Sequence, residues 1–228
     1  KYMTLPLEIL RQAWWRQPSF LMMLTLGLSL MLYPFTDEAR DLRNAAHFMD
    51  IVAVLLIGRL LRKQALLWHS GWILAIPLVL LQATMLFVST HALELAMRCA
   101  QLVFHLYAVV ALMSYVLSDD VITLDELFAL ASVYVLLALL WATAYALVVM
   151  FDPQAIFINS SNNPKNYVSF ADLVYFSMTT LTSTGYGEIT PVSPAARALA
   201  MLQQWVGVLF VAMLIARLTS LYKPSARG

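Results

Sequence analysis

Long apolar runs separated by short polar stretches form the dominant pattern of this sequence. A helix needs about 20 apolar residues to cross a bilayer, and roughly 17 are enough. Stretches that meet this length occupy residues 19–35, 45–61, 71–90, 93–118, 123–151 and 194–221. The pattern predicts an all-α membrane protein with six transmembrane helices.

Two shorter segments show helix signals without reaching spanning length. Residues 5–17 combine tryptophans and arginines, which suits either a helix along the membrane surface or the lead-in to the first span. Residues 169–172 read Ser-Phe-Ala-Asp, a capping signature for a helix that ends near Leu181. We expect this second helix to be re-entrant, and a similar capping box at 123–126 to begin the fifth span.

The composition supports a membrane location and argues against several functions. Of the 228 residues, 61% are hydrophobic and 12% are charged, whereas soluble domains carry about 25% charged residues. A net charge of +1 without a basic run argues against a nucleic-acid partner. The lone Cys99 excludes an intrachain disulfide, and the scattered histidines match no catalytic or metal-ligand spacing. We expect a protein surrounded by membrane lipid that is no enzyme and needs no cofactor.

Lysine and arginine near the span ends predict the orientation, because cytoplasmic loops are enriched in them. With six spans, nine of the 14 lysines and arginines fall on one side near the span ends: Lys1, Arg11, Arg16, Arg59, Arg62, Lys63, Arg217, Lys223 and Arg227. This side is predicted to be cytoplasmic. Both termini then lie in the cytoplasm, and the re-entrant helix enters a plasma or inner membrane from outside.

The segment between the re-entrant helix and the last span carries the clearest chemistry. Residues 182–188 read Thr-Ser-Thr-Gly-Tyr-Gly-Glu. Glycine reaches backbone conformations that are closed to other residues, and alternating such residues can turn successive carbonyls toward one axis. A ring of carbonyls can replace the hydration shell of K⁺. The segment resembles the selectivity filter of the potassium-channel superfamily, and the order span, short helix, filter, span resembles its pore.

This resemblance implies roles for individual residues. The ion-binding carbonyls would come from the filter itself: Ser183, Thr184, Gly185, Tyr186 and Gly187. The ring of Tyr186 would pack behind the filter, and the supporting residues would be Tyr175, Phe176, Thr179, Thr182 and Glu188. One chain supplies one filter strand, so the resemblance implies a homotetramer that conducts K⁺.

Three filter positions depart from the common pattern of that family. Ser183 stands where threonine is usual, Thr184 where valine or isoleucine is usual, and Glu188 where aspartate is usual. The added hydroxyl of Thr184 needs a hydrogen-bond partner. Two alternatives therefore stay open beside a potassium channel: a weakly selective cation channel, and a non-conducting membrane scaffold or modulatory subunit.

The last span contains candidates for a hinge and a gate. Gly207 follows Tyr186 at the spacing where the family places a hinge glycine, but a glycine also allows close helix packing. Val211, Ile215 and Thr219 recur every four residues beyond it and are the candidates for a narrow cytoplasmic end. Apolar constrictions of this kind can gate by dewetting.

The sequence divides into a front module, residues 1–118, and a pore domain, residues 119–228. Four spans before a pore resemble a voltage-sensor arrangement, in which the fourth helix is rich in arginine. Here the fourth span holds one arginine, Arg98, and one histidine, His105, so we expect weak or absent voltage dependence. Asp50 and Arg98 are expected at similar depth, which predicts an ion pair that Glu94 could share. His105 is interpreted as a buried, satisfied histidine or as a proton sensor.

An acidic connector joins the two parts. It consists of Asp119, Asp120, Asp125 and Glu126. Part of it is explained by capping of the fifth span. A cation site is the alternative.

Overall fold

The computed structural model describes residues 17–36, 40–60, 65–85, 87–88, 90–117, 123–159 and 167–221. Most of the expected surface segment at 5–17 lies outside these ranges, as do Asp119 and Asp120 of the acidic connector. The predictions made for them stay predictions.

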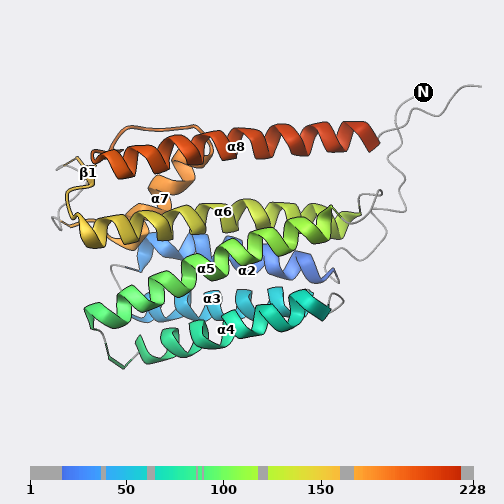
Figure 1. The fold of residues 1–228 in the computed structure, drawn as a ribbon, viewed down its shortest axis with the longest axis horizontal. Coiled ribbons are helices and arrows are strands. Elements are labelled where there is room, and N and C mark those ends of the chain that lie inside the picture. The colour runs from blue at the N-terminus through green and yellow to red at the C-terminus, as the bar shows by residue number, and fades with distance from the viewer. Residues whose placement is uncertain are drawn as a thin grey trace, which may run out of the picture.

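Each of the six apolar runs lies on a helix. In chain order the elements are α2 (Pro18–Leu32) with the 3₁₀ turn η2 (Tyr33–Phe35), α3 (Arg40–Leu60), α4 (Ala65–Met85), α5 (His91–Val116), α6 (Leu124–Phe151), β1 (Ile156–Ile158), α7 (Phe170–Leu181), β2 (Ile189–Pro191) and α8 (Pro194–Leu221). Successive long helices run in opposite directions, and the start of α2 lies at the same end as the close of α8 (Figure 1).

Local sequence signals explain where several helices begin. Thr123 Oγ1 accepts a hydrogen bond from the backbone N–H of Glu126, and the Glu126 carboxylate accepts one from the backbone N–H of Thr123. This capping box begins α6. Ser169 and Asp172 form the same arrangement at the start of α7. Both predicted capping boxes are therefore confirmed.

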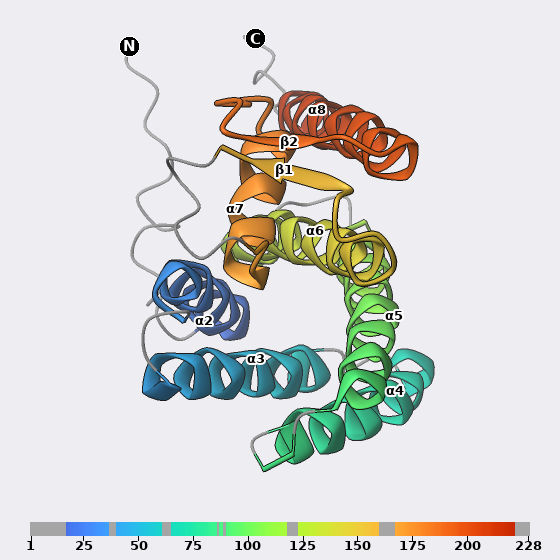
Figure 2. The same cartoon turned by 90° about the vertical axis from the view of Figure 1, so that its left-hand side faces the viewer.

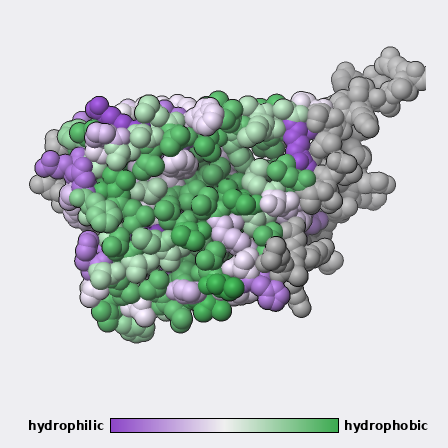
Figure 3. All heavy atoms as spheres, viewed as in Figure 1, coloured by the Kyte–Doolittle hydropathy of each residue, from purple (hydrophilic) through white to green (hydrophobic). Residues whose placement is uncertain are grey.

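Four helices within the described residues are long and apolar enough to cross a membrane: Pro18–Phe35, His91–Val116, Leu124–Phe151 and Pro194–Arg217. In α4 the apolar part is shorter, His69–Met85. Charged residues at the start of α3, together with Asp50 and Arg59, reduce its hydropathy. On the face shown in Figure 3, apolar side chains cover the middle and polar ones gather toward the end that carries β1. The chain is an α-helical membrane protein.

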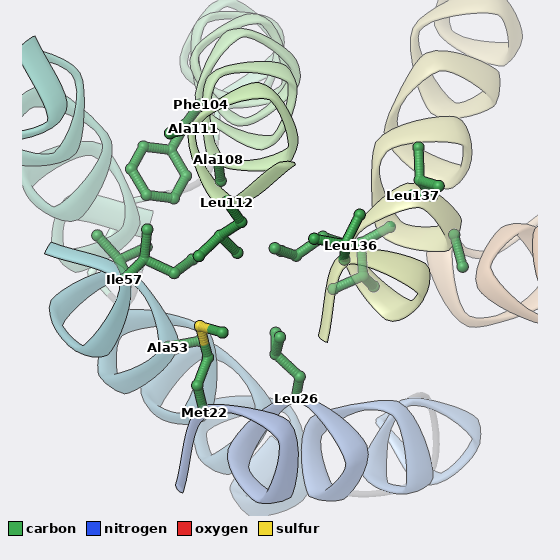
Figure 4. Close-up of a cluster of buried hydrophobic side chains, with 14 of the residues drawn as sticks. Met22, Leu26, Ala53, Ile57, Phe104, Ala108, Ala111, Leu112, Leu136 and Leu137 are labelled. Carbon is green, nitrogen blue, oxygen red and sulfur yellow. The ribbon is translucent and has the colours of Figure 1, made fainter. Parts of the chain in front are cut away.

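Helix α6 is the centre of the packing. In the end view of Figure 2 it lies between α7 and α8 on one side and α2 to α5 on the other. The main buried cluster joins the helices on that second side to α6, with Met22, Leu26, Ile57, Leu112 and Leu136 at its centre (Figure 4). The front helices therefore pack on the α6 of their own chain.

A two-stranded antiparallel sheet lies beside the filter segment. Ile156 pairs with Pro191 and Ile158 with Ile189. No strand was expected from the sequence, because three-residue strands have no readable period. The sheet joins the loop after α6 to the residues that follow the filter.

Candidate ion-conducting site

Helix α7 positions the filter segment, and a buried polar network holds α7 in place. Gln203 of α8 is fully buried, and its Nε2 donates to the backbone oxygen and to Oγ of Ser177, at 2.8 and 2.7 Å. The Tyr145 hydroxyl donates to Oε1 of Gln203 at 2.7 Å. Ser177 Oγ in turn donates to the Ala138 carbonyl at 2.6 Å. The network fixes α7 between α6 and α8, and the buried polar groups in it have hydrogen-bond partners.

Sequence reasoning missed this network. A glutamine inside an apolar helix was the available signal, because a buried amide needs several hydrogen-bond partners. The partners come from two other helices and could not be assigned without the fold.

The filter backbone alternates in conformation. Ser183, Gly185 and Gly187 have φ values of 56°, 53° and 87°. Glycine occupies this left-handed region freely, whereas a serine there is uncommon. Positive φ at every second residue is the pattern that the sequence suggested for turning carbonyls toward one axis. The pattern includes Ser183 as well as the two glycines.

The last turn of α7 anchors the first half of the filter segment. The Thr179 carbonyl accepts hydrogen bonds from the backbone N–H groups of Thr184 and Gly185, at 2.8 and 3.1 Å. The Thr180 carbonyl accepts one from Ser183 at 3.0 Å. Oγ1 of Thr182 lies 2.9 Å from Oγ1 of Thr184. The extra hydroxyl of Thr184 therefore has a partner within the same segment.

The second half of the filter segment is held by Tyr175. Its ring stacks nearly parallel to that of Tyr186, with centroids 6.4 Å apart and 8° between the planes. Its hydroxyl donates a hydrogen bond to Oε1 of Glu188. This bond raises the pKa of Tyr175 to about 12. The Glu188 carbonyl accepts from the backbone N–H of Asn159 at 3.0 Å, which joins the filter to the strand β1.

The two aromatic residues expected to brace Tyr186 have different positions. Tyr175 faces Tyr186, but Phe176 is buried and packs on Tyr145 with centroids 4.9 Å apart. Adjacent residues of a helix point about 100° apart, so only one of the two can face the filter. Phe176 supports α7 from behind.

The filter residues from Thr182 to Gly187 are exposed in the single chain, and the Tyr186 side chain is 71% exposed. Large apolar side chains on the neighbouring part of α8 are exposed as well, among them Trp205 at 64% and Met213 at 60%. One face of the site is therefore open.

Helix α8 passes very close to the end of α7 at Gly207. A Cβ atom on Gly207 would lie 2.2 Å from the Leu181 carbonyl oxygen. Of the two interpretations left open by the sequence, this contact supports close packing. Helix α8 continues through this position without interruption, from Pro194 to Leu221.

A cavity of about 390 Å³ lies below the filter. Its wall is formed by α6, the end of α7 and α8, through Tyr134, Leu181, Thr182, Ser183, Gly207, Val208, Val211, Ala212 and Ile215. Two of the gate candidates, Val211 and Ile215, therefore line the same cavity as Ser183. Thr219 lies one turn further on, and its hydroxyl donates to the Ile215 carbonyl at 3.0 Å.

Asp50 and Arg98, which were predicted to form an ion pair, have other partners. Asp50 accepts hydrogen bonds from Ser29 Oγ at 2.8 Å and from the Tyr33 hydroxyl at 2.7 Å. The Arg98 guanidinium lies over the Phe170 ring, 3.8 Å from its centroid, and donates to Gln101 at 3.1 Å. In place of a direct ion pair, Asp50 accepts from two hydroxyl groups, and Arg98 forms a cation–π contact.

The described half of the acidic connector has structural partners. Asp125 accepts hydrogen bonds from the backbone and the hydroxyl of Ser19, both at 3.0 Å, and from Tyr115 at 2.9 Å. Glu126 belongs to the capping box of α6. Within the described residues no group of three His, Cys, Asp or Glu side chains could hold a metal ion. The capping interpretation holds for Glu126, whereas Asp125 is bound by residues of α2 and α5.

The short helix α7, the following loop of alternating backbone conformation and the apolar helix α8 lie within the part of the chain that matches a known family. Residues 122–223 match the family described as Ion channel, and the chain belongs to this ion channel family. It is similar to Protein LctB of Bacillus caldotenax, with 32% identity over 98 residues that make up 42% of this chain and 72% of the relative. No solved structure matches the chain significantly.

Proposed function

We propose that the protein is a homotetrameric potassium channel that conducts K⁺ passively across a cell membrane. The observation that carries the proposal is the filter backbone, in which Ser183, Gly185 and Gly187 alternate with residues of negative φ. Carbonyls aligned by such a backbone replace the hydration shell of K⁺. The ion channel family membership supports conduction, and the resemblance of the filter motif supports K⁺ as the permeant ion.

Four copies are proposed because one chain cannot enclose an ion path. The exposed face of the filter and the exposed apolar side chains of α8 suit contact with identical neighbours around a cyclic axis. In this arrangement residues 119–228 form the pore domain, residues 1–118 form the front module, and all six long helices cross the membrane. Lipid covers the outer helices, and both termini are cytoplasmic.

The electrostatics below the filter favour a cation. The C-terminal end of α7 meets the cavity at Leu181. A helix carries roughly half a negative charge at this end. A hydrated cation in the cavity is stabilised by four such ends in a tetramer, while Val211 and Ile215 offer an apolar lining suited to a gate.

We expect conduction that depends weakly or not at all on voltage. A charge that crosses 100 mV gains about 2.3 kcal/mol, and α5 carries the single arginine Arg98, which the Phe170 ring and Gln101 hold in place. One restrained charge per chain cannot make opening steep. A steep conductance–voltage relation of the purified protein would contradict this part of the proposal.

The test is a flux assay on the full chain in liposomes with a K⁺ gradient, with Na⁺ and Ba²⁺ as controls. A potassium channel gives K⁺ flux that Ba²⁺ blocks, and reversal potentials that follow the K⁺ gradient. Equal permeation of Na⁺ points to the weakly selective alternative. Background flux from a protein shown to be tetrameric points to a scaffold or modulatory subunit.

A variant of the filter gives the matched control. Gly185 has a φ of 53°, a value that a side chain tolerates poorly. Gly185→Ala is expected to assemble normally and to lose K⁺ flux. Wild-type flux from this variant would show that conduction does not depend on the backbone described above.

A further inference from the structure

A small polar cavity lies inside the bundle of α2 to α6, away from the filter. Its volume is about 10 Å³, which is the lower limit for holding a water molecule. Apolar side chains form most of its wall, and four polar ones interrupt it: Asp50, Gln82, Gln101 and His105. These four polar side chains come from three helices, α3, α4 and α5.

Two of these side chains present buried atoms that have no partner among the described residues. They are Oε1 of Gln82 and Nδ1 of His105. The Gln82 side chain is 2% exposed. Buried polar atoms in folded proteins are almost always hydrogen-bonded to protein or to ordered water. A polar cavity with an unpartnered acceptor on its wall therefore suits water, which can bridge to the neighbouring carboxylate.

Asp50 is the acidic group on this cavity. Its oxygens accept from Ser29 and Tyr33, both neutral hydroxyls. An ionised carboxylate within a membrane segment is costly, and such residues mark proton relays and ion paths. A carboxylate that neutral donors hold beside a hydrated cavity can gain a proton without losing an ion-pair partner.

We propose that Asp50 is a proton-binding site of the front module, reached through the hydrated cavity lined by Gln82, Gln101 and His105, and that its occupancy regulates the pore. The step is simple proton uptake: a proton from solvent adds to one carboxylate oxygen, and the group becomes neutral. The regulatory half rests on the proposed channel function, while proton binding itself does not.

The charged and titratable groups around Asp50 come from two elements. Tyr33 of η2 donates to it directly. On α5, Arg98 and Glu94 interact electrostatically with this cluster, and His105 lines the cavity. Helix α4 contributes the neutral Gln82, and α6 contributes apolar leucines. Asp50 and His105 are therefore the two titratable side chains on the wall of this cavity.

The structure links this site to the filter helix. Tyr33, whose hydroxyl donates to Asp50, contacts the Phe170 ring edge-on, with centroids 5.3 Å apart. Phe170 is the first residue of α7, and its ring also contacts the guanidinium of Arg98. A protonated Asp50 is a weaker acceptor for the Tyr33 hydroxyl. The support of Tyr33 for the start of α7 then weakens, and we expect K⁺ flux to fall.

The experiment measures K⁺ flux of the full chain in liposomes between about pH 8 and about pH 5, the range in which folded proteins are generally most stable. Coupling between two sites usually changes a response by about fivefold or more, so wild-type flux should fall by at least that factor. Asp50→Asn should stay near the acid value at every pH. Asp152→Asn, the same change at an exposed position of the outer end of α6, should keep the wild-type profile.

Two further variants separate proton binding from transmission. Ser29→Ala removes a donor to the ionised carboxylate, so the midpoint of the profile should move to higher pH with its amplitude kept. Tyr33→Phe keeps the ring on Phe170 and cuts the bond to Asp50, so the amplitude should fall. These variants also carry the test if Asp50→Asn does not fold. A profile that is identical in wild type, Asp50→Asn, Ser29→Ala and Tyr33→Phe overturns the proposal.

Infrared difference spectra between the two pH values give a readout without conduction. A carboxylic acid C=O band that appears in the wild type on acidification and is absent in Asp50→Asn supports the site. If the protein gives no K⁺ flux at any pH, the channel function fails while this band still decides proton binding. A wild type without the band overturns the proton site.

Discussion

The close approach of α8 to α7 at Gly207 gives the sharpest test of the packing in the pore. We consider Gly207→Ala, which adds a single methyl group. Its Cβ would lie 2.2 Å from the carbonyl oxygen of Leu181 and 3.1 Å from the Leu181 side chain. Leu181 ends α7 directly before the filter, so a displacement of its carbonyl reaches the filter segment.

The magnitude follows from that distance. Cβ atoms do not approach other atoms closer than 3.0 Å, so at least 0.8 Å of movement is needed. The obstacle is backbone, which cannot rotate away as a flexible side chain can. Overpacking of this kind costs about 1–3 kcal/mol, and the better helix propensity of alanine offsets about 1 kcal/mol of it. We expect net destabilisation of about 1 kcal/mol and a loss of K⁺ flux.

Gly27→Ala in α2 is the matched control. A Cβ at Gly27 meets nothing within 4 Å, so the helix gains stability of up to about 1 kcal/mol without a clash. The assay compares the midpoint of thermal unfolding of both variants in detergent and their flux in liposomes. Gly207→Ala should lie below the wild type and Gly27→Ala at or above it. A hinge without a packing role predicts instead that both variants are stabilised, and this result would refute the clash argument.

The remaining predictions concern polar contacts. Gln203→Leu leaves buried partners unsatisfied at about 1–3 kcal/mol each, so its unfolding midpoint should fall, whereas Gln204→Leu at an exposed position should leave it nearly unchanged. The hydrogen bond from Tyr175 to Glu188 forms while the tyrosine is protonated. Its contribution to stability is therefore complete below the ordinary tyrosine pKa of 10.0 and is lost as pH rises through about 12. An absorbance titration of tyrosinate should show this late component and lose it in Tyr175→Phe. Asp125→Asn should lower the unfolding midpoint by weakening three hydrogen bonds, with an unchanged midpoint counting against a role in holding α2.

The sequence predicted those features that depend on neighbours in the chain. The capping boxes of Thr123 with Glu126 and of Ser169 with Asp172 join residues three apart, so their spacing alone specifies them. The apolar runs predicted the helices for the same reason. The filter was recognisable because its glycines sit in a short segment between two such elements.

The features that the sequence could not predict depend on how the helices rotate about their axes. Asp50 and Arg98 were expected at equal depth, which says nothing about the direction in which each side chain points. Asp50 faces the hydroxyls of α2 and η2, and Arg98 faces Phe170. Gln203 is a similar case, since its partners on α6 and α7 are brought to it by packing.

Helix α5 is attached to the pore near both of its ends, although it lacks the arginine row of a voltage sensor. Arg98, near its start, lies over Phe170 at the beginning of α7. At its close the Val116 carbonyl accepts a hydrogen bond from Arg217 of α8 at 2.8 Å. These two contacts are about 27 Å apart along the helix, at 1.5 Å per residue. A shift of α5 along its axis must therefore strain the start of α7 and the close of α8 together. In the proposed channel, we expect a stimulus that moves α5 to affect conduction without a large gating charge.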